Sequence, residues 1–131
     1  MSQENVEKLR AVYERWGRGD FWTPEVFDAD VEVVWGADMP DTGTYHGLGG
    51  LEEGAREFFK AWDEVAWSAD EIVDVDERVL VLATARGRGR GSGLATDTQF
   101  AHVWTMRDGK ATRIVAYTDR AEALKAVGLE E

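Results

Sequence analysis

The second half of the chain constrains the fold most, because it consists almost entirely of extended segments joined by tight turns. Runs rich in β-branched and aromatic residues predict strands near 66–75, 78–90, 95–107 and 111–118. The pair Asp108-Gly109 is typical of a two-residue hairpin turn, and Asp76-Glu77 gives a weaker turn signal. Consecutive strands with such short connections predict an antiparallel meander.

The first half of the chain has helical spacing instead. An apolar face predicts a helix over about residues 3–18; its members are Val6, Leu9, Val12, Tyr13 and Trp16. Thr23-Pro24 is a cap followed by proline at the first helical position, which starts a short second helix. After a strand over 31–35 and a short extended piece over 44–46, a third helix follows Gly50, with Leu51, Ala55, Phe58, Phe59 and Trp62 on one face.

The C-terminal end completes the pattern. Asp119 is positioned to cap a short helix that continues to Val127 and stops at Gly128. Helices therefore come first and strands last, which is the α+β arrangement. We expect one domain over residues 1–131, with a curved antiparallel sheet wrapped around three N-terminal helices and enclosing a cavity.

The composition excludes several classes of function. A net charge of −11 opposes binding to nucleic acid and to anionic membranes. No apolar stretch approaches the ~20 residues that span a bilayer, and no secretion signal is visible, so we expect a cytoplasmic protein. Without cysteine and with 2 histidines, neither a disulfide nor a metal site is expected. Phosphate-loop and dinucleotide motifs are absent, so no cofactor is expected.

Several segments resemble the SnoaL-like branch of the nuclear transport factor 2 superfamily. They are Tyr13–Asp20, Phe27–Trp35, Tyr45–Gly47 with the helix of Phe58 and Phe59, His102–Gly109, and Tyr117–Leu124. The resemblance extends over nearly the whole chain and keeps the order of the elements. It implies a cone-shaped α+β barrel, a deep pocket between the helices and the concave face, and a homodimer formed through the sheet.

The resemblance also allows a comparison with ketosteroid isomerases. Their catalytic carboxylate matches Trp35 in this sequence, and their oxyanion-hole acid matches Thr98 or a neighbour. Their tyrosine donor falls near Val12, with Tyr13 one position away. All three roles therefore look vacant, and steroid isomerisation by that mechanism is not expected.

His102 is the sharpest candidate for chemistry. Strand alternation places it on one face with Thr98, Phe100, Trp104 and Met106, and the resemblance turns this face toward the cavity. A histidine among aromatic residues can act as a general acid or base near neutral pH. The alternative is a structural histidine that is hydrogen-bonded to a neighbour.

Three further polar residues are candidates near the cavity mouth. Asp38 and Tyr45 would polarise or orient a substrate, and His46 would contact the ligand. Asp38, like Asp41, is also an ordinary loop residue, and His46 is also readily explained as a surface histidine. We carry His102, Asp38 and Tyr45 forward as catalytic candidates.

The aromatic content points to a ligand site. Six tryptophans are more than the core of a small domain requires. Besides His46, the predicted ligand-binding residues are Trp16, Trp35, Phe59, Trp62, Phe100, Trp104 and Tyr117. We therefore expect binding of a small, largely hydrophobic molecule, with cofactor-free isomerase, cyclase or hydratase chemistry if the protein is an enzyme. The alternatives are a ligand carrier or sensor, and a protein-interaction module.

Overall fold

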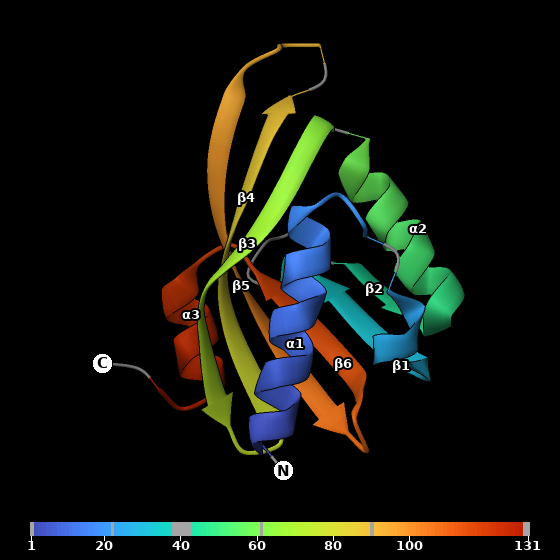
Figure 1. Ribbon diagram of the computed structural model, residues 1–131, viewed down its shortest axis with the longest axis vertical. Coiled ribbons are helices and arrows are strands. Elements are labelled where there is room, and N and C mark those ends of the chain that lie inside the picture. The colour runs from blue at the N-terminus through green and yellow to red at the C-terminus, as the bar shows by residue number, and fades with distance from the viewer. Residues whose placement is uncertain (1, 22, 38–42, 61, 90, 130–131) are drawn as a thin grey trace.

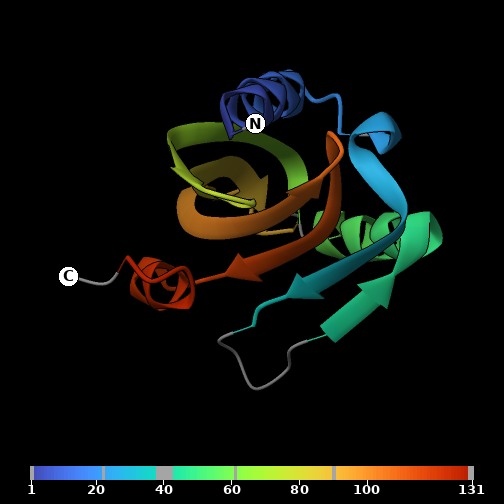
Figure 2. The same ribbon diagram turned by 90° about the horizontal axis from the view of Figure 1, so that it is seen from below.

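A strongly curved sheet organises the fold (Figures 1 and 2). The computed structural model describes residues 2–21, 23–37, 43–60, 62–89 and 91–129, and within these residues six strands form one sheet in the order β2-β1-β6-β5-β4-β3. The elements in chain order are α1 (Ser2–Gly17), η1 (Pro24–Val26), β1 (Phe27–Trp35), β2 (Gly43–His46), α2 (Gly47–Phe59), β3 (Trp62–Val75), β4 (Arg78–Gly89), β5 (Ala95–Arg107), β6 (Lys110–Tyr117) and α3 (Arg120–Ala126).

The predicted fold class is confirmed, with two refinements. The sheet is mixed, because β1 pairs with β6 in the parallel direction while the other pairs are antiparallel. It also stays open, since β2 and β3 form its two edges in the described part of the chain. The parallel pair arises because β6, the last strand of the meander, lies between β5 and β1 and runs in the same direction as β1.

The strand boundaries follow the sequence pattern closely in the second half. β5 covers Ala95–Arg107, as predicted, whereas β3 already begins at Trp62. The prediction that Trp62 lies on the third helix is wrong, because α2 ends at Phe59 and Trp62 pairs with Gly89 of β4. Helical spacing alone does not reveal where pairing with a distant strand takes over.

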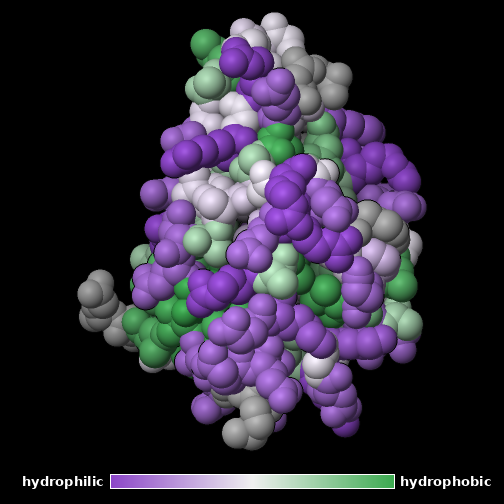
Figure 3. Space-filling view, in the orientation of Figure 1, coloured by the Kyte–Doolittle hydropathy of each residue, from purple (hydrophilic) through white to green (hydrophobic). Residues whose placement is uncertain are grey.

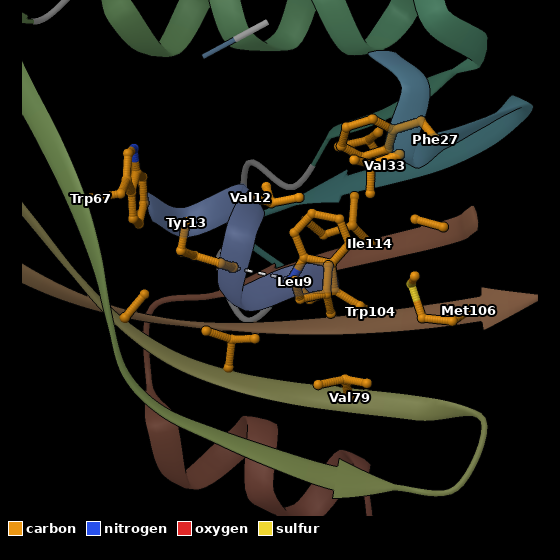
Figure 4. Packing of buried hydrophobic residues seen from close by; sticks show 14 of the residues in the cluster. Leu9, Val12, Tyr13, Phe27, Val33, Trp67, Val79, Trp104, Met106 and Ile114 are labelled. Carbon is orange, nitrogen blue, oxygen red and sulfur yellow. Dashed lines mark hydrogen bonds between the residues drawn. The ribbon is translucent and has the colours of Figure 1, made fainter. Parts of the chain in front are cut away.

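The concave face of the sheet carries the main core. α1 packs against β3, and α2 packs against β1 and β2. Leu9, Val12 and Tyr13 of α1 are buried against the concave residues of β4 and β5 (Figure 4). The concave residues of β4 are small, namely Val79, Val81, Ala83 and Ala85, and so leave room for large aromatic rings from the neighbouring strands.

The convex face carries a second cluster. Its buried residues lie beneath α3, the red helix near the C-terminus in Figure 2, and include Leu80, Ala101, Val103 and Val115. Asp119 caps α3 as predicted, because its Oδ1 accepts a hydrogen bond from the Ala121 amide at 2.9 Å. No helix among the described residues is long and apolar enough to cross a membrane. The face shown in Figure 3 is dominated by hydrophilic residues.

Candidate functional site

A small pocket lies between the concave face of the sheet and helices α1 and α2. Its volume is about 70 Å³, and the described residues that line it are Trp16, Phe21, Phe27, Val33, Trp35, Leu51, Ala55, Phe59, Trp67, His102 and Ile114. Nearly all of these side chains are aromatic or aliphatic. An imidazole in such a wall is the exception, because His102 is the one titratable side chain among the described lining residues.

His102 reaches this wall because of the alternation of β5. It pairs with Val81 of β4 and Ala116 of β6, which are small enough to leave space on the concave face. The side chain is buried, with 2% of the residue exposed. Its ring centroid lies 5.1 Å from that of Trp67. The predicted position of His102 on the concave face is therefore the observed one.

A buried hydrogen-bond chain connects His102 to α1. The Tyr13 hydroxyl lies 2.6 Å from His102 Nδ1. Trp104 Nε1 donates a hydrogen bond to the same hydroxyl at 3.1 Å, as the dashed line in Figure 4 shows. Helix α1 and strand β5 thus hold three polar atoms within hydrogen-bond distance inside an apolar core, where each such bond is stronger than in water.

Burial sets the charge state of this chain. It lowers the pKa of His102 to about 4, because desolvation penalises the imidazolium form. Burial also raises the pKa of the Tyr13 hydroxyl well above its ordinary value, an effect only partly offset by the hydrogen bond from Trp104. Both side chains are therefore neutral at pH 7. The hydrogen bond between them joins a neutral phenol to a neutral imidazole.

Tyr13, which the structure places beside His102, was not selected as a candidate from the sequence. Its place on the first helix is one position from that of the isomerase tyrosine, so the role looked vacant. The signal was nevertheless present, because Tyr13 lies on the apolar face of α1 and a buried tyrosine hydroxyl needs a partner. His102 was the polar side chain predicted to point toward that face.

The predicted tryptophan and phenylalanine residues of the ligand site divide into two groups. Trp16, Trp35 and Phe59 line the pocket with His102. The others have different places: Trp62 covers Gly87 of β4, Phe100 packs on Trp67, and Trp104 is fully buried. None of these three aromatic side chains is part of the described lining, although Phe100 and Trp104 pack against residues that are.

The remaining candidates are not part of the described lining or lie outside the described residues. Tyr45 is half-buried and packs against Gly50 and Gly54 of α2, and His46 is exposed on β2. Tyr117 packs in the cluster on the convex face, which separates it from the pocket by the thickness of the sheet. Asp38, together with Asp41, lies outside the described residues.

Close packing positions the indole of Trp35. A side chain at Gly54 of α2 would meet Trp35 Nε1 and, at 3.3 Å, Tyr45 Cδ2. Glycine at this buried helical position therefore provides the space in which Trp35 reaches the pocket. Among the residues that the structure describes, no group of three or more His, Cys, Asp or Glu could hold a metal ion.

Comparisons with known proteins agree on the family and the fold. The family model described as a SnoaL-like domain matches residues 9–114. No curated protein matches the sequence. Among solved structures, an NTF2-like protein of unknown function from Burkholderia pseudomallei is similar, with 25% identity over 95% of this chain and 97% of that one, and a TM-score of 0.75.

Two other solved structures have similar sequence identity. TerC, co-crystallised with polyporic acid, is 26% identical over 95% of this chain and 98% of its own, with a TM-score of 0.74. An NTF2-like protein from Burkholderia xenovorans is 27% identical over 89% of this chain and 90% of its own, with a TM-score of 0.65.

Proposed function

The chain belongs to the SnoaL-like domain family, and on that premise we propose that it binds a small, largely hydrophobic organic molecule in the pocket beneath α1 and α2. The observation that carries the proposal is an almost wholly apolar pocket with one buried imidazole in its wall. Pockets that combine an apolar lining with a few convergent polar groups are the usual form of small-molecule sites.

A relative supports the class of ligand. TerC, with which this chain shares 26% identity over almost the whole length of both, has been crystallised with polyporic acid. We carry over from that protein the expectation of an organic ligand. Polyporic acid is therefore a reasonable first probe for this chain.

The size of the pocket sets a condition on binding. A volume of about 70 Å³ is close to that of two or three water molecules. A larger ligand requires lining side chains to move outward. The rings of Phe21 and Phe59, whose centroids lie 4.6 Å apart, come from the segment after α1 and the end of α2. We propose that these two rings move apart when the ligand enters.

Catalysis is a second candidate function, and the pair of Tyr13 and His102 favours it. A hydrogen-bonded tyrosine and histidine in a site that excludes water can stabilise charge that develops on a substrate. The reaction class is cofactor-free proton transfer, as in an isomerase, cyclase or hydratase. Against this stands the absence of a carboxylate from the described lining, which favours a carrier or sensor.

Binding is tested directly through the tryptophans of the pocket. Trp16, Trp35 and Trp67 line it, so a ligand that enters changes the intrinsic fluorescence. Titration with a panel of polyporic acid and flat aromatic ketones should give a saturable change for at least one of them, confirmed by calorimetry. Absence of saturable binding across the whole panel would contradict the proposed function.

A cavity-filling variant locates the binding. Ala55 of α2 lines the pocket, and Ala55→Leu adds apolar atoms to the space that a ligand requires. We expect this variant to stay folded and to lose binding at least tenfold, because overlap with the ligand is sterically unfavourable. Ala121→Leu is the matched control, since Ala121 is exposed on α3. Equal losses in the two variants would place the binding elsewhere.

The catalytic candidate has a separate test. An enolisable ketone that binds should exchange its α-hydrogens with D₂O faster in the presence of the protein than in buffer. His102→Asn should abolish this excess if His102 takes part. Binding without excess exchange would identify a carrier or sensor. A cytoplasmic location, a single domain over residues 1–131 and a homodimer through the sheet remain predictions.

A further inference from the structure

We propose that Tyr13 holds His102 in the neutral tautomer that carries its proton on Nε2, so that the pocket presents hydrogen-bond donors and selects uncharged ligands with a carbonyl-type oxygen. Tyr13 is in this view a positioning residue, and His102 is the residue that contacts the ligand. The inference rests on the proposed function, because it names the ligand class of the same pocket.

The hydrogen bonds of Tyr13 determine where its hydroxyl proton lies. A tyrosine hydroxyl has one proton to donate and lone pairs to accept. Since Trp104 Nε1 can only donate, the Tyr13 oxygen accepts in that bond. Tyr13 then has its own proton to place, and among the described residues the remaining partner of its hydroxyl is His102 Nδ1. Donation to Nδ1 satisfies both buried groups.

The opposite arrangement leaves a buried group unsatisfied. If His102 Nδ1 carried the proton and donated to Tyr13, the hydroxyl proton of Tyr13 would lack a described acceptor. Tyr13 is 2% exposed, so water does not provide one at the surface. A buried donor without a partner is unfavourable, and the cost of leaving it unpaired selects the tautomer in which Tyr13 donates.

The bond to Tyr13 also determines which nitrogen of His102 carries the proton. With Nδ1 accepting from Tyr13, a neutral imidazole carries its proton on Nε2. Nε2 lies on the other side of the ring from the bond to Tyr13, and the residue lines the pocket. His102 therefore offers the ligand an N–H donor. A low pKa reinforces this role, because the ring stays neutral at pH 7.

The other polar side-chain atoms of the described lining are also hydrogen-bond donors. The other described lining residues with a polar side-chain atom are Trp16, Trp35 and Trp67, and an indole nitrogen donates but does not accept. Trp16 Nε1 is buried without a hydrogen-bond partner among the described residues. The described side chains of this pocket thus provide donors and no acceptor.

The charge of the lining restricts the ligand further. The described lining contains no arginine, lysine or carboxylate. A carboxylate ligand would lose its hydration in this pocket without gaining a counter-ion, which is unfavourable. A hydroxyl or amine donor would find no acceptor among the lining side chains. A neutral ketone, quinone or lactone fits an apolar lining that offers donors and carries no charge. Its carbonyl oxygen only accepts, its body is apolar, and it has no net charge.

The tautomer can be measured without a ligand. The chain has 2 histidines, so His46→Asn leaves His102 as the single imidazole in a long-range ¹H–¹⁵N spectrum. We expect a protonated-type shift at Nε2 and an unprotonated-type shift at Nδ1. The reverse pattern, or averaged shifts at both nitrogens, would overturn the inference. Tyr13→Phe in the same background should produce averaging, whereas Tyr117→Phe should leave the pattern unchanged.

Ligand selection is tested with matched probes of equal shape. We would measure by calorimetry the binding of 2-acetylnaphthalene, 2-ethylnaphthalene and 2-naphthoate. The ketone should bind about tenfold more tightly than the hydrocarbon, which corresponds to one hydrogen bond in a dry site, and the anion should bind most weakly. Tyr13→Phe should reduce the preference for the ketone.

The outcomes separate the inference from the proposed function. Equal binding of ketone and hydrocarbon would leave the apolar pocket intact as a ligand site and would refute the donor role of His102. Tightest binding of 2-naphthoate would also refute it. If none of the probes bound and polyporic acid also failed, the proposed function itself would fail, while the spectrum would still decide the tautomer.

Discussion

The Tyr13 hydroxyl lies 2.6 Å from Nδ1 of His102, although the two residues are 89 positions apart in the chain. The bond joins the first helix to the third strand of the meander, inside a core from which water is excluded. It is a buried contact between a residue that lines the pocket and the helix that covers it. The first predictions therefore concern these two residues.

Removing the Tyr13 hydroxyl should destabilise the fold. Tyr13→Phe leaves Trp104 Nε1–H and His102 Nδ1 without their partner in the core. We expect the free energy of unfolding to fall by about 2–4 kcal/mol, since each unsatisfied buried polar group costs about 1–3 kcal/mol. Urea unfolding measures this. Tyr117→Phe removes the same hydroxyl from the convex face, and an equal loss there would contradict the prediction.

His102 should make stability depend on pH. Its pKa is about 4 in the folded protein, against an ordinary value of 6.5. The unfolded chain therefore binds the proton first as the pH falls, and stability decreases between pH 6.5 and pH 4 and is fully present above that window. The shift corresponds to roughly 3 kcal/mol. Because carboxylates also titrate in this range, the relevant quantity is a difference between variants.

The matched variant for this measurement is His102→Asn. Its amide oxygen can accept from Tyr13 but does not titrate. The stability advantage of the original protein over this variant should shrink as the pH falls from 6.5 to 4. An advantage that stays constant over the window would show that His102 is not buried in the neutral form.

Gly54 should be irreplaceable for the pocket wall. In Gly54→Ala the new methyl group meets the indole of Trp35 and displaces it, so we expect a loss of about 1–3 kcal/mol in the free energy of unfolding. The tryptophan fluorescence should change as well. Gly49→Ala is the control on the same helix, because nothing lies within 4 Å of its added methyl group. That variant should gain about 0.5–1 kcal/mol from helix propensity.

The cap of α3 should contribute measurably. Asp119 accepts a hydrogen bond from the Ala121 amide at the start of the helix. Asp119→Ala should cost about 0.5–2 kcal/mol, and Asp119→Asn should cost much less because asparagine caps nearly as well. Hydrogen exchange of the first turn of α3 reports the effect locally. Unchanged exchange in the alanine variant would show that the helix is held by packing alone.

The meander illustrates what a sequence predicts well. β5 covers 95–107 as expected, and His102 occupies the predicted face. The Asp119 cap is also where the sequence placed it. Alternation, turn type and capping depend on residues within a few positions of one another, so local sequence contains the information.

The candidate site was only partly predictable, because its lining depends on contacts between residues that are distant in the chain. Trp104 and Tyr117 are aromatic residues of the kind that often line ligand sites. Trp104 is nevertheless enclosed in the core, and Tyr117 lies on the convex face. Trp67 and Phe21 line the pocket without having been singled out. Aromatic content predicts that a pocket exists, but the side chains that reach it depend on how the sheet curves and which helix covers it.

The sequence by itself determined the α+β order, the family resemblance, the strand faces and the position of His102 on the concave face. The tertiary structure decided that Tyr13 meets His102, that Trp104 donates to Tyr13, and that Trp35 fits against Gly54. Each of these contacts joins elements that are distant in the chain. Their geometry follows from packing the whole core at once, and no local pattern in the sequence encodes it.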